Sequence, residues 1–454
     1  MRIHAEAALL PDGWTRDVTV EIGKDGAIAS VVRSAGEPPD HSVAVLLPAV
    51  ANLHSHTFQR AMAGMTETRS PEGKGDSFWT WRTLMYRFLD ILTPDEIEAV
   101  ARFAFMEMLE AGYGAVAEFH YLHHAAGGDA YGDRAELAGR IVRAAGTTGI
   151  GLTLLPVYYQ RGGLDGRPLA GGQLRFGNDL DGFARLLDGA RHHLKTLGPD
   201  ARLGLAPHSL RAASAGDIAQ LAARMPESPI HLHIAEQEAE VAEVEAATGR
   251  RPVEWLLESF DVDERWCLVH ATQMTPSETE AMAKSGAIAG LCPVTEANLG
   301  DGTFPASPFL AAGGRFGVGT DSNVRISLAE ELRQLEYSQR LLRKARSVLA
   351  EPGGSVGRFL YEGALAGGSA ALGRESGRIE AGCIADLMSL RADASSDLPD
   401  GDAVLDGWIF AANGIAVDEV WSAGRHVVEG GVHHRRDEIA AAYRAAQRAI
   451  RSRL

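Results

Sequence analysis

The middle of the chain, residues 48–377, alternates short apolar runs with longer stretches of helical periodicity. This alternation is typical of βα units, which build a parallel sheet. In residues 94–110, for example, Pro94 opens the helical pattern and Gly112 follows its end, the usual start and stop signals of a helix. Eight units predict an α/β protein with a (β/α)8 TIM-like barrel. The eight runs end at residues 54–56, 120–121, 157–159, 207–208, 233, 270, 292–293 and 320–321.

The two chain ends have a different pattern. Short runs of apolar or alternating apolar and polar residues lie between Gly and Asp turns, which is typical of strands. The predicted strands are 7–10, 18–22, 28–32, 385–390, 408–411, 416–421 and 426–429. We expect residues 1–47 and 378–433 to form one composite β-sandwich domain beside the barrel of residues 48–377. Residues 434–454 have the pattern of a basic amphipathic helix, and we expect it to dock on its own chain or on a dimer partner.

Composition narrows the classes of function. The 454 residues include 44 Lys+Arg and 60 Asp+Glu, for a net charge of −16. A chain this acidic is a poor ligand for nucleic acid or an anionic membrane, so we expect neither as a partner. Cys267, Cys292 and Cys383 form no C-x-x-C pair, which argues against a disulfide framework. No apolar stretch reaches the roughly 18 residues of a membrane span, and the N-terminus lacks a signal-peptide core. We expect a cytoplasmic protein.

Histidine and aspartate side chains gather at the predicted strand ends. His54 and His56 are two residues apart and therefore point the same way from a strand. His233, His270 and Asp321 end the fifth, sixth and eighth strands. Because barrel chemistry sits at this edge, His54, His56, His233 and Asp321 are predicted to hold a divalent metal. The alternative is a set of hydrogen-bonded core or surface histidines.

Glu236 lies three residues after His233, just past the strand end. A carboxylate at this offset could act as general base toward a water on the metal and then as general acid toward a leaving nitrogen. The alternative interpretation is an acid at a helix N-terminus, where the helix dipole favours it.

This set of strand-end residues resembles the amidohydrolase superfamily, and in particular its one-metal deaminase branch. The resemblance covers essentially the whole chain, including the segment 377–386 after the barrel. No lysine stands at a predicted strand end, where two-metal members carry one, so one metal per subunit is expected. The resemblance implies zinc, with Glu236, His270 and Asp321 as catalytic residues, although three His and one Asp would also hold iron, cobalt or nickel.

Several more particular blocks resemble the formimidoylglutamate deiminase family, whose members hydrolyse N-formimino-L-glutamate to N-formyl-L-glutamate and ammonia in histidine degradation. The blocks are residues 52–64, 78–82, 118–121, 207–211, 233–237, 292–301 and 319–323. Such relatives are commonly homodimers, which we expect here as well.

The substrate of that family has two carboxylates, and Arg binds a carboxylate through a planar fork. Arg82 and Arg211 are the predicted clamps, and the resemblance implies hydrogen bonds from Gln59, Tyr121 and His208. The alternatives are a surface cation at Arg82, an ion pair of Arg211 with an acid such as Asp217, and a barrel-rim aromatic at Tyr121. Two other functions stay open: a one-metal deaminase of guanine or an adenosine derivative, and a barrel protein without catalysis.

Overall fold

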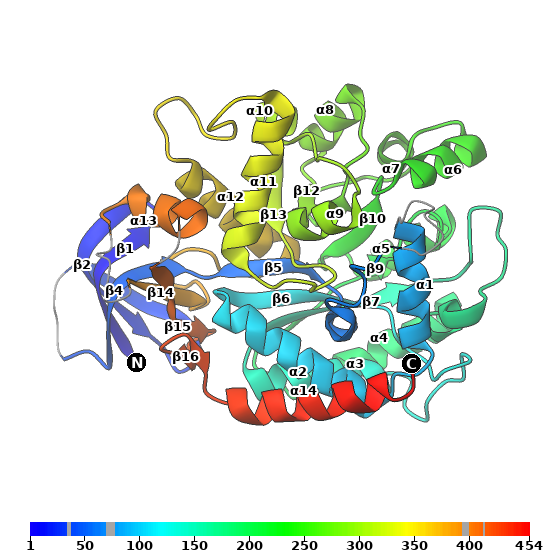
Figure 1. The fold of residues 1–454 in the computed structure, drawn as a ribbon, viewed down its shortest axis with the longest axis horizontal. Coiled ribbons are helices and arrows are strands. Elements are labelled where there is room, and N and C mark those ends of the chain that lie inside the picture. The colour runs from blue at the N-terminus through cyan, green and yellow to red at the C-terminus, as the bar shows by residue number, and fades with distance from the viewer. Residues whose placement is uncertain (34–37, 70–77, 393–398, 412–413) are drawn as a thin grey trace.

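The computed structural model describes residues 1–33, 38–69, 78–392, 399–411 and 414–454. Its central part is a parallel barrel (Figure 1) whose strand ends fall where the apolar runs of the sequence end. The fourth barrel position is split into two short strands, β8 and β9. The barrel strands are β5 (Val50–Ser55), β6 (Tyr113–His120), β7 (Gly151–Tyr158), β8 (Arg202–Leu203), β9 (Ala206–Pro207), β10 (Ile230–Ile234), β11 (Trp266–His270), β12 (Ile288–Leu291) and β13 (Arg315–Val318).

Two parallel sheets make up the barrel wall, one of β5, β6, β7 and β8 with β9 on β7, and one of β10 to β13. Isolated parallel bridges join them, Leu205–Ile230 and Ser209–His233 on one side and Ser55–Asp321 on the other. At the Ser55–Asp321 bridge, the Asp321 amide donates a hydrogen bond to the His54 carbonyl oxygen at 2.9 Å. The predicted (β/α)8 barrel is therefore confirmed.

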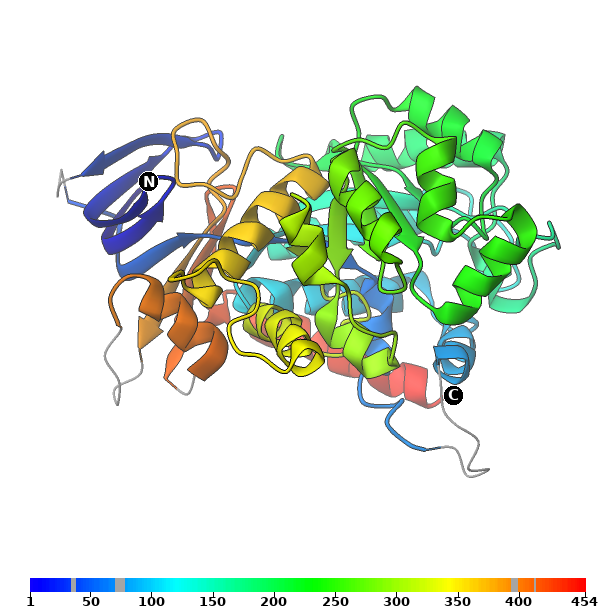
Figure 2. The same ribbon diagram turned by 90° about the horizontal axis from the view of Figure 1, so that it is seen from above.

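Helices follow most of the barrel strands and cover the outside of the wall (Figure 2). Helix α2 has the bounds that the sequence predicts, because Thr93 and Glu96 form a capping box at its start. Among the described helices, none is long and apolar enough to cross a membrane. The helices are α1 (Phe78–Leu89), α2 (Pro94–Glu110), α3 (Glu136–Thr148), α4 (Leu180–Leu194), α5 (Ala215–Arg224), α6 (Glu238–Thr248), α7 (Pro252–Ser259), α8 (Pro276–Ser285), α9 (Pro293–Leu299), α10 (Ala306–Ala311), α11 (Leu328–Arg343) and α12 (Val356–Leu372), with short turns η1 (Thr57–Met62) and η2 (Gly171–Arg175).

The two chain ends meet in one continuous sheet, the terminal sheet, at one end of the molecule (Figures 1 and 2). The sequence predicts a sandwich here; the strands form a single hydrogen-bonded path that encloses its own apolar core, including Ile3, Val20, Val43 and Trp421. The order is β17 (Val432–His433), β16 (Arg425–Glu429), β15 (Ile415–Ser422), β14 (Leu387–Ala392), β4 (His41–Pro48), β1 (Arg2–Leu10), β2 (Gly13–Ile22) and β3 (Ile28–Arg33).

One predicted strand of the tail, residues 408–411, is wrong. The chain there forms helix α13 (Asp402–Asp406) and the π-helical turn η3 (Gly407–Ala411). The buried residues Val404, Leu405, Trp408 and Ile409 recur at helical spacing and face the core together. The apolar run was too short for its period to separate a strand from a helix.

The C-terminal helix α14 (Arg436–Arg451) lies along α2 on the outside of the barrel (Figure 1). The rings of Phe103 and Tyr443 stack with their centroids 3.9 Å apart. The Tyr443 hydroxyl donates to the carbonyl oxygen of Arg60 at 3.2 Å. The amphipathic pattern of this helix thus serves packing against its own chain.

Candidate active site

The five predicted strand-end residues lie together, buried, at one mouth of the barrel. His54 is in β5, His56 follows it, His233 is in β10 and His270 ends β11. Asp321 comes three residues after the end of β13. His270 and Asp321 have positive φ angles of 69° and 43°, a costly backbone state for residues other than glycine. Such strain is typical of functional sites, where the surrounding structure enforces it.

The close approach of β13 to β5 depends on a glycine. A Cβ on Gly319 would lie 2.7 Å from both the amide nitrogen and the carbonyl oxygen of His54. Since backbone atoms cannot move aside cheaply, only glycine fits here. This contact holds the first and last barrel strands together directly at the histidine cluster.

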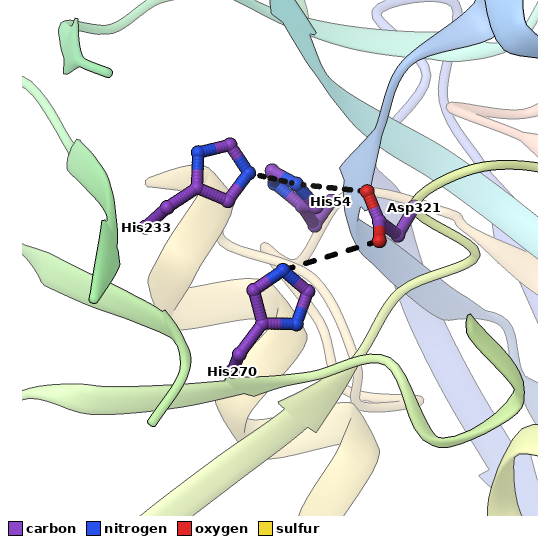
Figure 3. Close-up of side chains that lie close together, drawn as sticks. All are labelled: His54, His233, His270 and Asp321. Atoms are coloured by element: carbon purple, nitrogen blue, oxygen red, sulfur yellow. Dashed lines mark hydrogen bonds and ion pairs between the residues drawn. The ribbon is translucent and has the colours of Figure 1, made fainter. Parts of the chain in front are cut away.

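The ligand atoms of His54, His233, His270 and Asp321 converge on a small volume (Figure 3). His54 Nε2 lies 3.0 Å from His233 Nε2 and 3.2 Å from His56 Nε2. Asp321 Oδ1 lies 3.4 Å from His54 Nε2 and 3.2 Å from His56 Nε2. His270 is farther out, with Nε2 at 3.9 Å from Asp321 Oδ2. The available atoms of His54, His233, His270 and Asp321 all lie within 4.8 Å of one another.

Backbone carbonyls decide which ring nitrogens carry the proton. His56 Nδ1 donates to the Phe119 carbonyl oxygen at 3.0 Å, and His233 Nδ1 donates to the His208 carbonyl oxygen at 3.1 Å. A carbonyl oxygen only accepts, so the proton of each neutral ring is on Nδ1. Each Nε2 therefore presents a lone pair to the centre of the cluster.

Burial keeps these rings neutral. It lowers the pKa of His54, of His56 and of His233, and neighbouring imidazoles lower the pKa of His54 and His233 further. Neutral Nε2 atoms about 3 Å apart, facing a carboxylate oxygen, repel one another unless a cation lies among them. The donor set thus fits a divalent metal such as zinc.

Glu236 and His270 border this cluster. Burial, with the nearby charges of Asp321 and Glu240, raises the pKa of Glu236 to about 7. The carboxyl group lies 3.8 Å from His270 Nε2. Burial lowers the pKa of His270, but the carboxylates of Glu236, Glu296 and Asp321 outweigh it and raise that pKa well above its usual value. A carboxyl group poised near neutrality can accept and donate a proton in turn.

Glu296, in α9, is a residue that the sequence interpretation missed. Its Oε1 lies 3.4 Å from His270 Nδ1 and accepts a hydrogen bond from the Cys292 amide at 2.9 Å. The carboxylate is buried and holds the orientation of the His270 ring. Its position four residues after the end of a predicted strand was the available signal.

A pocket opens over the cluster, and all of the predicted substrate residues line it: Gln59, Arg82, Tyr121, His208 and Arg211. Asp217, proposed from sequence as a partner of Arg211, instead accepts a hydrogen bond from the Tyr158 hydroxyl at 3.0 Å. Arg211 Nε is a buried donor that has no hydrogen-bond partner within the described part of the chain. A buried donor in this state is costly, so the pocket suits an anionic ligand.

Gln59, Arg82 and His208 each contact a tyrosine in the lining of the pocket. The Gln59 side-chain amide donates to the Tyr121 hydroxyl at 2.9 Å, and the Gln59 Oε1 atom is a buried acceptor with no hydrogen-bond partner among the described residues. Arg82 lies over the ring of Tyr86, 5.2 Å from its centroid. His208 contacts the Tyr159 ring edge-on at 4.7 Å. Tyr86 and Tyr159 were not identified from the sequence, because neither belongs to a motif.

Comparison with known proteins agrees with this geometry. Residues 45–427 match the model of the amidohydrolase family, and residues 1–40 match the N-terminal domain of the formimidoylglutamate deiminase HutF. The chain is 50% identical over 445 residues to a formimidoylglutamate deiminase of Pseudomonas aeruginosa, covering 97% of each chain.

Solved structures give the same result. A crystal structure of an amidohydrolase from Brucella melitensis superposes with a TM-score of 0.94 at 50% identity, over 99% of each chain. An adenosine deaminase from Xanthomonas campestris, solved with bound zinc, has a TM-score of 0.80 at 22% identity, over 99% of this chain and 98% of that one, and shares the fold. The chain therefore belongs to the amidohydrolase family and, within it, to the formimidoylglutamate deiminases.

Proposed function

We propose that this protein hydrolyses N-formimino-L-glutamate to N-formyl-L-glutamate and ammonia. The observation that carries the proposal is the pocket with two arginines, Arg82 and Arg211, over a cluster of metal-ligand type. The formimidoyl end of the substrate would face the cluster, and its two carboxylates would face the arginines. The similarity to a relative named formimidoylglutamate deiminase, at 50% identity, supports this substrate. Degradation of histidine is the metabolic setting in which this reaction fits.

His54, His56, His233 and Asp321 are the proposed metal ligands. The Nε2 atoms of His54 and His56 and the Asp321 oxygen are mutually 3.2–3.4 Å apart, close to the spacing of roughly 3.3–3.6 Å between ligands of a tetrahedral zinc ion. His270 lies farther out, and three neighbouring carboxylates raise its pKa, which favours the protonated ring. Zinc is the proposed ion, at one per subunit. When bound, it supplies Lewis acidity and lowers the pKa of a water molecule.

Glu236 is the proposed proton carrier. Water adds to the formimidoyl carbon, and Glu236 takes the proton that the water loses. The carboxyl group then gives this proton to the imine-derived nitrogen. As the C–N bond breaks and ammonia leaves, the hydroxyl group of the tetrahedral centre becomes the carbonyl and returns its proton to Glu236. His270 donates a hydrogen bond to the developing tetrahedral centre. Because the pKa of Glu236 is about 7, both proton transfers are close to balanced at neutral pH.

Substrate recognition follows from charge. Arg82 and Arg211 are the proposed clamps for the two carboxylates, because they are the two arginines in the described lining of the pocket. Gln59, Tyr121 and His208 are proposed to donate or accept further hydrogen bonds. The proposal includes a homodimer, for which light scattering should give twice the mass of one chain. Location in the cytoplasm stays a prediction.

Ammonia release tests the function. We expect one ammonia per N-formimino-L-glutamate consumed, loss of this release after treatment with a chelator, and its return on addition of zinc. Guanine and adenosine are the comparison substrates. Faster release from either purine would replace the proposal by a purine deaminase, and no release from any of them would favour a barrel protein without catalysis.

A further inference from the structure

A second group of imidazole and carboxylate side chains lies on the terminal sheet, away from the pocket. It consists of His41 at the start of β4, Glu419 in β15 and His426 in β16, and we name it the sheet cluster. The ligand atoms of these three residues all lie within 4.8 Å of one another. Strand β14 separates β4 from β15 in the sheet, so curvature of the sheet, and not strand pairing, brings His41 to Glu419.

The distances within the sheet cluster are close to those between metal ligands. Glu419 Oε2 lies 3.2 Å from His41 Nδ1 and also 3.2 Å from His426 Nε2. Ligands of a tetrahedral zinc ion, each about 2.0–2.2 Å from the metal, lie roughly 3.3–3.6 Å apart. One carboxylate oxygen thus stands at ligand spacing from two imidazole nitrogens at once.

The contacts of Glu419 with His41 and with His426 have the geometry of ion pairs. Glu419 Oε2 and His426 Nε2 are both buried atoms, and neither has a hydrogen-bond partner within the described ranges of the chain. Two buried polar atoms that are close together and unsatisfied carry a free-energy cost. A cation between them would satisfy both atoms together.

The surroundings allow an ion to enter and to be held. The side chains of His41, Glu419 and His426 are 25%, 15% and 17% exposed, so solvent reaches the group. Trp421 forms an apolar wall, stacked on the His426 ring at 5.1 Å and edge-on to the His41 ring at 5.5 Å. Burial, together with the neighbouring imidazoles, lowers the pKa of His426 to about 4.

We propose that His41, Glu419 and His426 bind a divalent transition-metal ion of the zinc type, in a site separate from the catalytic cluster of His54, His56, His233 and Asp321. The ring of His434 lies edge-on to that of His426, with the two centroids 5.0 Å apart. Such an ion would tie the N-terminal strand β4 to the C-terminal strands β15 and β16. Its effect would be on the stability of the terminal sheet and not on turnover.

Zinc stoichiometry tests the proposal. Protein freed of metal is titrated with zinc by calorimetry, and the bound metal is measured after gel filtration. We expect Glu419→Gln and His426→Gln each to bind one equivalent fewer per chain than the wild type, with unchanged kcat/KM. The matched control is His193→Gln, because His193 pairs with Asp133 at 2.8 Å without a third ligand; this variant should bind as much zinc as the wild type.

The test compares the number of zinc ions bound per chain in the wild type and in the variants, so the zinc bound at the catalytic cluster cancels. Equal zinc stoichiometry in wild type, Glu419→Gln and His426→Gln would overturn the proposal. Circular dichroism of the metal-free proteins checks that the variants fold. In addition, zinc beyond the first equivalent should raise the unfolding midpoint of the wild type by more than that of Glu419→Gln, since binding to the folded state alone stabilises it.

Discussion

The catalytic cluster and the sheet cluster use the same kinds of side chain in different surroundings. In the catalytic cluster, at one mouth of the barrel, the His54 side chain is wholly buried and that of Asp321 is nearly so. In the sheet cluster, His41 and Glu419 are partly exposed on a curved sheet. Imidazole and carboxylate atoms stand 3.0–3.4 Å apart in the first and 3.2 Å apart in the second. Spacing alone therefore does not distinguish them.

The difference lies in what surrounds each set of donors. The catalytic cluster has a pocket above it, a carboxyl group with a pKa of about 7 beside it, and two arginines in the lining of that pocket. The sheet cluster has an aromatic wall formed by Trp421, and no other acid within the described residues is grouped with it as a metal ligand. A set of ligands holds an ion, whereas catalysis also requires a proton carrier and a place for the substrate.

The largest effect should come from removing a ligand of the catalytic cluster. His54→Ala or His233→Ala should lose one equivalent of zinc and bring turnover to background, because each removes one of four donors. The exposed His192 on α4 gives the control, His192→Ala, with normal metal and activity. Elemental analysis and ammonia release are the measurements. A full equivalent of metal retained at this site in both variants would contradict the ligand assignment.

Replacement of the proton carrier should come next in size. Glu236→Gln keeps the volume of the side chain but cannot carry a proton, so kcat should fall by roughly 10²–10⁴-fold, the usual contribution of general acid–base catalysis. Zinc content and substrate binding should not change. Steady-state kinetics measure the effect. The control variant is Glu238→Gln, which changes an exposed acid two residues later. Near-normal turnover of Glu236→Gln would assign the proton transfer to another group, with His270 as the next candidate.

The arginine clamps should have an intermediate effect. Arg82→Met or Arg211→Met should cost about 2–5 kcal/mol of transition-state stabilisation, seen in kcat/KM, because a charge-assisted partner of the substrate is lost. Metal content should match the wild type. Arg87→Met, on the same helix as Arg82, and Arg224→Met, on α5, are the controls. If both clamp variants keep the wild-type kcat/KM, the substrate is not the diacid.

The smallest effect is the response to pH. Burial raises the pKa of Glu236 to about 7, and a general base acts only in its ionised form. As the pH falls below about 7, kcat/KM should therefore drop tenfold per unit. The residual activity of Glu236→Gln should lack this acid limb. A wild-type profile that is flat from pH 5 to 8 would show that ionisation of Glu236 does not limit the reaction.

Much of the fold could be predicted because its signals are local. The capping pair Thr93 and Glu96 and the following apolar period specify α2 through contacts within a few residues. Residues 408–411 were predicted wrongly because a four-residue apolar run fits both periods, and only burial against the rest of the chain selects the helix. Glu296 was missed because its contact with His270 joins α9 to the end of β11.

The sequence by itself determined the eight βα units and the strand ends at which His54, His233 and Asp321 stand, since residue type and spacing along one strand are visible in it. Tertiary structure alone decided which ring nitrogens face the centre, because the acceptors at Phe119 and His208 come from other strands. It also decided that His41 meets Glu419 and His426, residues nearly the whole chain apart. Distances between strands depend on how the sheet curves, and this curvature results from the packing of the entire core.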